Sequence, residues 1–188
     1  KLVKPYFLVT YHPVTLSKNG AVDGLKHLLL ALEHFKEFQI IITYPNADNF
    51  GNEIIECLNR YAKQHQERVV LVKSLGQLRY LSAIKHAAAV VGNTSSGLIE
   101  VPSFNVPTVN IGNRQKGRIA GASVIHCEDN FEAISYAIKK AISSGFKNAI
   151  ASTSNPYGHG GSSQAIYSKI KTTKFDGIIH KKFFDLSF

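Results

Sequence analysis

Short apolar runs alternate with amphipathic helical segments along this chain, and that alternation limits its fold more than any other feature. The apolar runs predict strands at residues 6–11, 39–44, 68–72, 88–91, 107–111 and 123–126. Apolar residues at helical spacing predict helices at 22–38, 49–66, 77–86, 96–104, 130–144 and about 163–171. Because strands that alternate with helices pair in parallel, the sequence predicts an α/β fold whose mostly parallel sheet is covered on both faces.

The loop after the strand at 88–91 is the most informative about function, and it reads Gly-Asn-Thr-Ser-Ser-Gly-Leu-Ile-Glu. Unpaired amides and the positive dipole end at a helix start attract an anion, and the hydroxyls of Thr94, Ser95 and Ser96 add donors. Glu100 lies one helical turn beyond Ser96, where its carboxylate can accept hydrogen bonds from a sugar diol. The combination suggests a nucleoside diphosphate, although turn geometry alone also favours such residues after a strand.

Three further loops follow predicted strands, at the edge where a parallel sheet binds its ligands. His12 opens the sequence His-Pro-Val-Thr, and a histidine there can donate to a phosphate or transfer a proton. Asn46 lies in Pro-Asn-Ala-Asp, which is a turn signal first and a candidate ligand second. Residues 110–118 carry three cations, among them Arg114, whose planar guanidinium suits phosphate oxygens. A histidine that only caps a loop and a solvated basic turn are the simpler alternatives.

Taken together, these loops resemble those of the hydrolysing UDP-N-acetylglucosamine 2-epimerases, the bacterial enzymes of sialic acid biosynthesis and their animal relatives. The resemblance covers most of the chain in matching order, at residues 12–15, 45–48, 92–100, 102–104, 107–118 and 124–126. Non-hydrolysing relatives instead carry a Ser-Gly-Gly loop and an acidic Thr-Glu-Arg-Pro segment. This chain has Ser-Ser-Gly at 95–97 and Asn-Arg-Gln-Lys-Gly at 113–117, which favours the hydrolysing branch.

The resemblance implies one half of a GT-B-type architecture, in which two Rossmann-like domains face each other across a cleft and the second holds most of the nucleotide. This chain resembles the second, so residues 1–172 are expected to form a three-layer, Rossmann-like UDP-binding domain. Residues 173–188 are expected to form a tail whose aromatic residues Phe183, Phe184 and Phe188 pack on a missing N-terminal domain. Because the chain contains no methionine, we expect a fragment of a longer protein, which forms a homo-oligomer when intact.

The resemblance also implies roles for the residues around the loop at 92–100. The segment that receives the UDP diphosphate is matched by Thr94, Ser95, Ser96 and Gly97. Glu100 matches the glutamate that binds the ribose hydroxyls. The animal enzymes have cysteine where this chain has Ser96, a difference that leaves the chemistry intact.

Further site residues are implied in the other loops. His12 matches the cleft histidine that touches the diphosphate and the sugar, which makes it the catalytic candidate, and Arg114 matches an arginine near the nucleotide. Asn46 matches a residue close to the substrate. Leu75 and Tyr80 match positions around the uracil, although helix packing explains Tyr80 equally well.

The reaction implied by the resemblance removes the proton at C2 of UDP-N-acetylglucosamine and eliminates UDP in the anti sense. Water then adds to the resulting glycal and yields free N-acetylmannosamine, with neither cofactor nor metal. The acid–base carboxylates of the family lie in the other domain, so this chain alone is expected to be inactive.

Two alternatives share the nucleotide contacts. One is a sister epimerase that acts on a UDP-2,4-diacetamido-trideoxyhexose for legionaminic-type acids, and the missing domain would decide between the two. The other is a nucleotide-sugar-binding module without catalysis, or half of a glycosyltransferase. Glycosyltransferases of this architecture lack the Gly-Asn-Arg-Gln-Lys-Gly segment at 112–117, which ranks them lower.

The net charge of +9 raises the question of nucleic acid. The late cations are scattered over 139–140, 169–171 and 181–182, and aromatic side chains do not alternate with them as a stacking platform requires. No apolar stretch reaches membrane-spanning length, and the first residues lack a signal-peptide layout. We therefore expect a cytoplasmic protein that binds neither nucleic acid nor a membrane.

Overall fold

The structure is a computed structural model that describes residues 3–14, 22–177 and 179–180. The chain divides into two compact units, residues 1–158 and residues 159–188. Thr15 of the His-Pro-Val-Thr segment and the tail aromatics Phe183, Phe184 and Phe188 lie outside the described residues.

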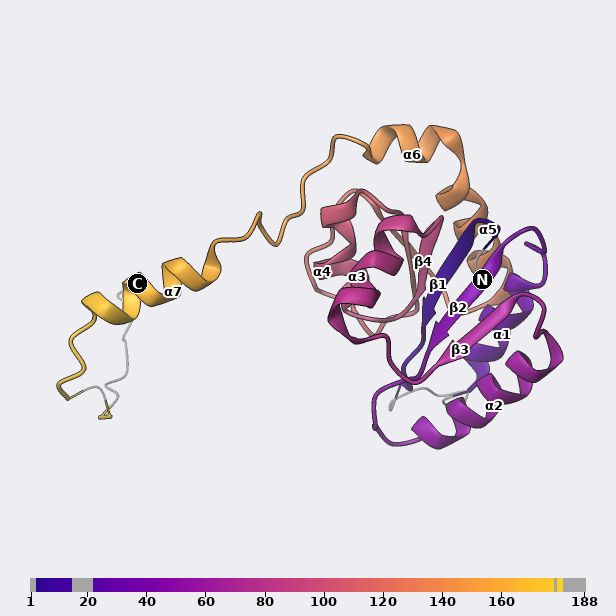
Figure 1. The fold of residues 1–188 in the computed structure, drawn as a ribbon, viewed down its shortest axis with the longest axis horizontal. Coiled ribbons are helices and arrows are strands. Elements are labelled where there is room, and N and C mark those ends of the chain that lie inside the picture. Colours follow the sequence, from indigo (N-terminus) through magenta and orange to yellow (C-terminus); the bar gives the residue numbers. More distant parts are fainter. Residues whose placement is uncertain (1–2, 15–21, 178, 181–188) are drawn as a thin grey trace, which may run out of the picture. The chain divides into compact units, whose positions relative to one another are not determined.

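The first unit is built on a six-stranded sheet in which all neighbouring strands are parallel. Its strands are β1 (Tyr6–Thr10), β2 (Gln39–Thr43), β3 (Val69–Val72), β4 (Ala89–Gly92), β5 (Thr108–Ile111) and β6 (Val124–Cys127). They lie in the order β3-β2-β1-β4-β5-β6, so the chain adds strands on one side of β1 and then continues on the other (Figure 1). This order and the parallel pairing confirm the predicted Rossmann-like α/β sheet.

Helices cover both faces of the sheet (Figure 1). They are α1 (Asp23–Leu32), α2 (Gly51–Gln64), α3 (Gly76–His86), α4 (Ser96–Ile99), the 3₁₀ helix η1 (Val101–Phe104), α5 (Phe131–Ile142) and α6 (Ser144–Ile150). Successive side chains of a strand point to opposite faces, so Phe7 and Val9 pack with residues of α1, α2 and α5. Leu8 lies in a smaller cluster on the other face, with Ile84 of α3 and Val101 of η1. The sheet and its two helical covers make the predicted three layers.

Two predicted helices end earlier than their apolar spacing indicated. α1 stops at Leu32, and beyond it the guanidinium of Arg68 takes up the carbonyls of Leu32, Phe35 and Phe38 at 3.0, 3.1 and 3.5 Å. The predicted helix at 96–104 is divided into α4 and η1. Pro102 has no N–H to donate to the carbonyl four residues earlier, so an α-helix cannot continue through it.

The sequence predicted one helix at 130–144 and did not predict the short helix α6 that follows it. The chain is extended at Ser143, which ends α5 and separates it from α6. The Ser143 hydroxyl then accepts from the backbone N–H of Phe146 at 3.3 Å and caps a new helix. Ser143, which lies inside the predicted helix at 130–144, is therefore the residue that separates α5 from α6.

The second unit contains α7 (Ser162–Thr172), which the sequence predicted at about 163–171. No side chain of α7 is buried, and its apolar residues Ile166, Tyr167 and Ile170 are exposed. The first compact unit ends at residue 158, whereas the predicted domain extends to residue 172. That residues 159–172 fold together with the sheet stays a prediction. In the part of the chain that the structure describes, no helix combines the length and apolar character that a membrane crossing requires.

Candidate functional site

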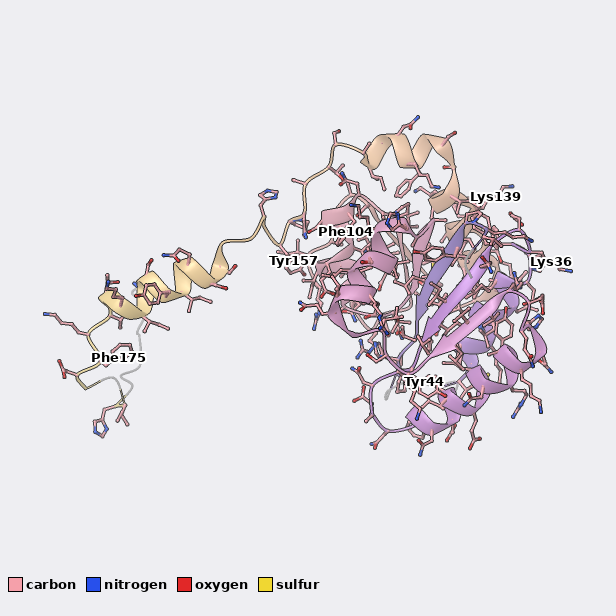
Figure 2. The ribbon with its side chains drawn as sticks, viewed as in Figure 1. Lys36, Tyr44, Phe104, Lys139, Tyr157 and Phe175 are labelled. Atoms are coloured by element: carbon pink, nitrogen blue, oxygen red, sulfur yellow. The ribbon has the colours of Figure 1, made fainter. Side chains whose placement is uncertain are left out.

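The strand order reverses between β1 and β4, and parallel α/β sheets bind ligands at the carboxyl ends of strands that flank such a reversal. A cleft of about 560 Å³ lies at this point and extends past the ends of β2 and β3. Seven of the predicted site residues line it: His12, Asn46, Leu75, Tyr80, Thr94, Ser96 and Glu100. Tyr44, labelled in Figure 2, also lines the cleft and donates to Asn59 Oδ1 at 3.1 Å.

The other three predicted site residues, Ser95, Gly97 and Arg114, are not among the residues that line the cleft. Ser95 precedes α4, and its carbonyl accepts from the backbone N–H groups of Leu98 and Ile99 at 3.0 Å. Gly97 is buried, and a Cβ there would lie 2.7 Å from Cγ2 of Thr108, so α4 approaches β5 only because this residue is glycine. Arg114 Nη1 donates to the carbonyl of Asn93 at 3.3 Å, which brings the arginine to the base of the loop after β4.

The end of β4 lies directly against the end of β1 because it is a glycine. Gly92 has φ +144°, a conformation that side chains disfavour, and a Cβ there would overlap the carbonyl oxygen of Thr10. The close approach places the residues after β4 next to those after β1. The two loops therefore form one site.

Hydrogen-bond donors gather where the loop enters α4. Within the described residues, the backbone N–H groups of Thr94 and Ser95 donate to no protein acceptor. The Ser96 hydroxyl accepts from Tyr80 Oη at 3.0 Å and keeps its own proton for another acceptor. α4 has only four residues, so these N–H and O–H groups contribute more to anion binding than the helix dipole that the sequence suggested.

Leu75 and Tyr80 both line the cleft and pack against the smaller hydrophobic cluster. Helix packing of Tyr80 therefore does not exclude a place in the cleft, and its position beside the uracil stays a prediction. Burial raises the pKa of Tyr80, so the phenol stays protonated at neutral pH and remains a donor to Ser96. This bond links α3 to the loop after β4.

His12 is buried, and its ring orientation is set by a hydrogen bond from the Asn46 backbone N–H to Nδ1 at 3.1 Å. Because Nδ1 accepts, Nε2 carries the proton. Burial and, second, the charge of Arg114 lower the pKa of His12 to about 4, against a smaller opposing effect of Asp48. The ring is therefore neutral at pH 7, and it is suited to donate a hydrogen bond rather than to bind a phosphate as a cation.

The cations of the 110–118 loop do not act together. Only Arg114 donates to the loop after β4. Lys116 and Arg118 line a separate hollow of about 620 Å³ beside β5 and β6, with His126 and Glu128. The site thus gathers one of the three cations that the sequence suggested for a diphosphate.

Two buried residues of the site were missed in the sequence. Asn93, with 0% of its surface exposed, bonds to the backbone of His12, and Gln115, 2% exposed, donates to the Asn93 carbonyl at 2.9 Å. An asparagine directly after a buried strand is a signal that could have identified the first. Nothing local distinguishes Gln115 from the solvated residues around it. In the described ranges, no group of three or more His, Cys, Asp and Glu side chains is placed to hold a metal ion.

Comparison with known proteins supports the resemblance seen in the loops. Residues 1–171 match the family model described as UDP-N-acetylglucosamine 2-epimerase. The chain belongs to this family. Over 187 residues it is 38% identical to the GDP/UDP-N,N'-diacetylbacillosamine 2-epimerase (hydrolyzing) of Campylobacter jejuni, covering 99% of this chain and 48% of that protein. Over 158 residues it is 42% identical to polysialic acid biosynthesis protein P7 of Escherichia coli, covering 83% of this chain and 40% of that protein.

The chain therefore spans somewhat less than half the length of these curated relatives. The fold agrees with the structure of MnaA from S. aureus in complex with UDP, with a TM-score of 0.70 over 89% of this chain and 44% of that chain. The identity in that comparison is 19%, so it shows a shared fold. Both results are in keeping with the predicted half of a two-domain, GT-B-type epimerase.

Proposed function

We propose that the chain is the UDP-binding half of a hydrolysing UDP-N-acetylglucosamine 2-epimerase, a cytoplasmic enzyme that needs no cofactor and forms a homo-oligomer when intact. The whole enzyme converts UDP-N-acetylglucosamine and water to N-acetylmannosamine and UDP for sialic acid biosynthesis. The observation that carries the proposal is the cleft at the reversal of strand order, where the donors of the loop after β4 lie with His12, Tyr80 and Glu100. Membership of the epimerase family supplies the reaction class.

In this proposal, the diphosphate lies against the loop after β4. The N–H groups of Thr94 and Ser95 and the hydroxyl of Ser96 donate to its oxygens, Gly97 lets the loop approach, and Arg114 balances the charge. Glu100 accepts from the ribose hydroxyls, while Leu75 and Tyr80 lie beside the uracil. Asn46 lies close to the sugar. Elimination expels a diphosphate, so donors already in position stabilise the negative charge that develops on it.

His12 acts in the proposed reaction as a neutral donor. Its Nε2–H is the ring proton available to the leaving diphosphate, because Nδ1 is engaged by Asn46. The lowered pKa and the occupied Nδ1 argue against His12 as the base that removes the C2 proton. That base, and the acid that returns a proton to C2, are expected in the other domain.

This division of roles predicts that the 188-residue chain binds UDP but does not turn over UDP-N-acetylglucosamine. Loss of general acid–base groups typically slows a reaction about 10²–10⁴-fold for each group, and loss of the opposing cleft wall removes positioning as well. Proton NMR of the chain with the nucleotide sugar should therefore show neither N-acetylmannosamine nor released UDP. Sustained formation of both would place the acid–base groups within this chain.

UDP binding itself is the test of the proposed site. Titrating UDP into the ¹⁵N-labelled chain should shift the amides of residues 93–98 first. UMP, which lacks the second phosphate, is the matched control and should shift these amides less at equal concentration. Shifts confined to other residues, or none at millimolar UDP, would remove the nucleotide assignment.

The C. jejuni relative favours a second candidate substrate, a UDP-2,4-diacetamido-trideoxyhexose, whereas the name of the E. coli relative favours sialic acid biosynthesis. The two candidates share the nucleotide contacts. Assaying the whole protein with both nucleotide sugars in D₂O decides between them. The true substrate gives UDP and a free sugar with deuterium at C2, because the elimination removes that proton and hydration replaces it from solvent. A glycosyltransferase or a binding module would give no deuterated sugar.

A further inference from the structure

The carboxamide of Asn93 is bonded to both backbone polar groups of one residue. Its Oδ1 accepts from the N–H of His12 at 2.7 Å, and its Nδ2 donates to the carbonyl of His12 at 2.8 Å. The ladder between β1 and β4 ends at the pair Thr10 and Gly92, so the side chain continues the pairing where the backbones no longer can. Both bonds are buried, and they fix the backbone from which the His12 ring projects.

The backbone of Asn93 makes further connections. Its N–H donates to the carbonyl of Thr10 at 3.3 Å, on β1. Its carbonyl accepts from Gln115 Nε2 at 2.9 Å and from Arg114 Nη1 at 3.3 Å, both in the loop after β5. One residue thus joins the loops that follow β1, β4 and β5. The side chain of Asn93 itself does not line the cleft.

We propose that Asn93 is a positioning residue of this site: its carboxamide sets the orientation of His12, and its carbonyl holds Arg114 beside the loop after β4. With the His12 backbone held in place, Nδ1 meets the Asn46 N–H and Nε2 carries the proton. The inference rests on the proposed function only for the identity of the ligand, because the contacts exist without one.

The chemistry of the position requires an amide. His12 presents one donor and one acceptor to residue 93, and among side chains of this size only asparagine offers the complementary pair in fixed geometry. An aspartate would place a carboxylate against the His12 carbonyl, and an apolar residue would leave both backbone groups without a partner. A buried, fully bonded amide also specifies one arrangement of the loops.

The first test is the state of the His12 ring in Asn93→Ala, measured without nucleotide by ¹⁵N NMR of the imidazole in the 188-residue chain. In the unchanged chain the ring should be the Nε2–H form from pH 5 to 8, with a pKa of about 4. In the variant the pKa should move toward the ordinary 6.5 and both tautomers should appear. UDP affinity should fall about tenfold or more. An unchanged His12 ring in a folded variant would overturn the proposal.

Asn110→Ala is the matched control. Asn110 is also a buried amide, 1% exposed, at the carboxyl end of β5, and it bonds to His126 Nδ1 at 3.0 Å rather than to His12. Asn110→Ala also removes a buried amide at the carboxyl edge of the sheet, and it should leave the pKa and tautomer of His12 unchanged. An equal change of the His12 ring in Asn110→Ala would mean that general loosening explains the first result.

Gln115→Leu tests the second connection and guards against an Asn93→Ala chain that does not fold. Gln115 Oε1 has no hydrogen-bond partner among the described residues, so leucine removes one bond and one unpaired oxygen at nearly constant volume. This variant should fold, weaken UDP binding and leave the His12 ring unchanged. Gln115→Leu removes one of the two bonds between the Asn93 carbonyl and the loop that carries Arg114, so unaltered UDP affinity would refute the claim that this carbonyl positions the loop. Measurements on the unchanged chain decide the proposal even if no variant at position 93 folds, because mixed tautomers of His12 and a pKa near 6.5 would refute the claim that Asn93 orients the His12 ring.

Absence of UDP binding in the unchanged chain would contradict the proposed function, while the ring measurement would still decide whether Asn93 positions His12.

Discussion

Two groups of buried polar residues lie at opposite ends of the sheet, and they differ in what their hydrogen bonds leave open. Before β3, the Arg68 guanidinium donates to three backbone carbonyls, to Glu33 Oε1 at 2.9 Å and to Tyr61 Oη at 3.2 Å. Tyr61 in turn donates to Glu33. At the carboxyl end, around Asn93, the loops are equally well connected, but the N–H groups of Thr94 and Ser95 point to no acceptor in the described chain.

The comparison separates a polar cluster whose bonds are made within the protein from one that leaves donors without a protein acceptor among the described residues. The Arg68 cluster matches its positive charge with a carboxylate and satisfies carbonyls at the end of α1, so its bonds are nearly complete within the protein. The carboxyl-end group holds a neutral histidine and an arginine with no carboxylate bonded to it in the described residues. Donors that remain unmatched at a cleft, with a cation in an adjoining loop, are typical of sites for anionic ligands.

The largest effect is expected from Arg68→Ala, which breaks the first cluster. Three carbonyls and a carboxylate lose their donor in a buried setting, so the free energy of unfolding should fall by about 3–5 kcal/mol. UDP affinity, measured under conditions in which the variant is folded, should not change. Urea unfolding and calorimetric titration give the two quantities. Lys26→Ala is the control, because the pair of Lys26 with Asp23 is exposed to solvent and exposed ion pairs contribute little to stability. A loss of UDP affinity in folded Arg68→Ala would mean that the two ends are not independent.

The next effect concerns the charge state of His12. Its pKa in the folded chain, about 4, lies below the ordinary 6.5, so the unfolded chain binds the proton more readily between these values. The resulting stabilisation is fully present above pH 6.5 and is lost as the pH falls from 6.5 to 4. It amounts to roughly 3 kcal/mol.

The variant His12→Asn, which keeps an acceptor for Asn46, isolates that contribution from other titrating groups. The difference in unfolding free energy between wild type and variant should shrink by this amount between pH 7 and pH 4. Urea unfolding at both pH values measures it. A difference that does not depend on pH would contradict a neutral, buried His12.

Arg114→Ala is expected to show the converse of Arg68→Ala. Removing a charged donor beside the diphosphate should weaken UDP binding by about 1.5–3 kcal/mol. Stability should fall by less than about 1 kcal/mol, because Gln115 still donates to the Asn93 carbonyl. Calorimetric titration with UDP checks the first value and urea unfolding the second. The neighbouring cation variant Lys116→Ala should leave UDP affinity unchanged, since Lys116 lines the separate hollow.

The smallest effect is expected from Glu100→Gln at the exposed edge of the cleft. Loss of the Glu100 carboxylate charge should weaken UDP binding by about 1.5 kcal/mol, the lower value for a hydrogen bond to a charged group. The variant should bind 2',3'-dideoxy-UDP as well as the wild type does, because that ligand lacks the ribose hydroxyls. Equal weakening with both ligands would place Glu100 away from the ribose.

Local pattern was enough to predict the layers of this fold. The strands and most helices were correct because hydrophobic periodicity is a property of neighbouring residues, and alternating strands and helices leave few topologies open. The division of α4 from η1 was also readable in principle, since Pro102 lacks an N–H wherever it stands. The end of α1 could not be read in the same way, because it depends on Arg68, which lies 30 to 36 positions along the chain from the carbonyls that it satisfies.

The residues of the candidate site also fall into two groups, those that the sequence indicated and those whose roles required the tertiary structure. The position of Thr94, Ser96 and Glu100 at the cleft could be predicted from the sequence, because residue type and position after a strand already indicate donors and a carboxylate at a sheet edge; their contacts with a nucleotide stay predictions. The roles of Asn93 and Gln115 and the neutral state of His12 required the tertiary structure. Asn93 and His12 are 81 positions apart, and only the meeting of strand ends brings them together. The pKa of His12 depends on burial and on Arg114, neither of which is a property of its neighbours in sequence. Side-chain partners and charge states are set by long-range packing, whereas periodicity and turn chemistry are set locally.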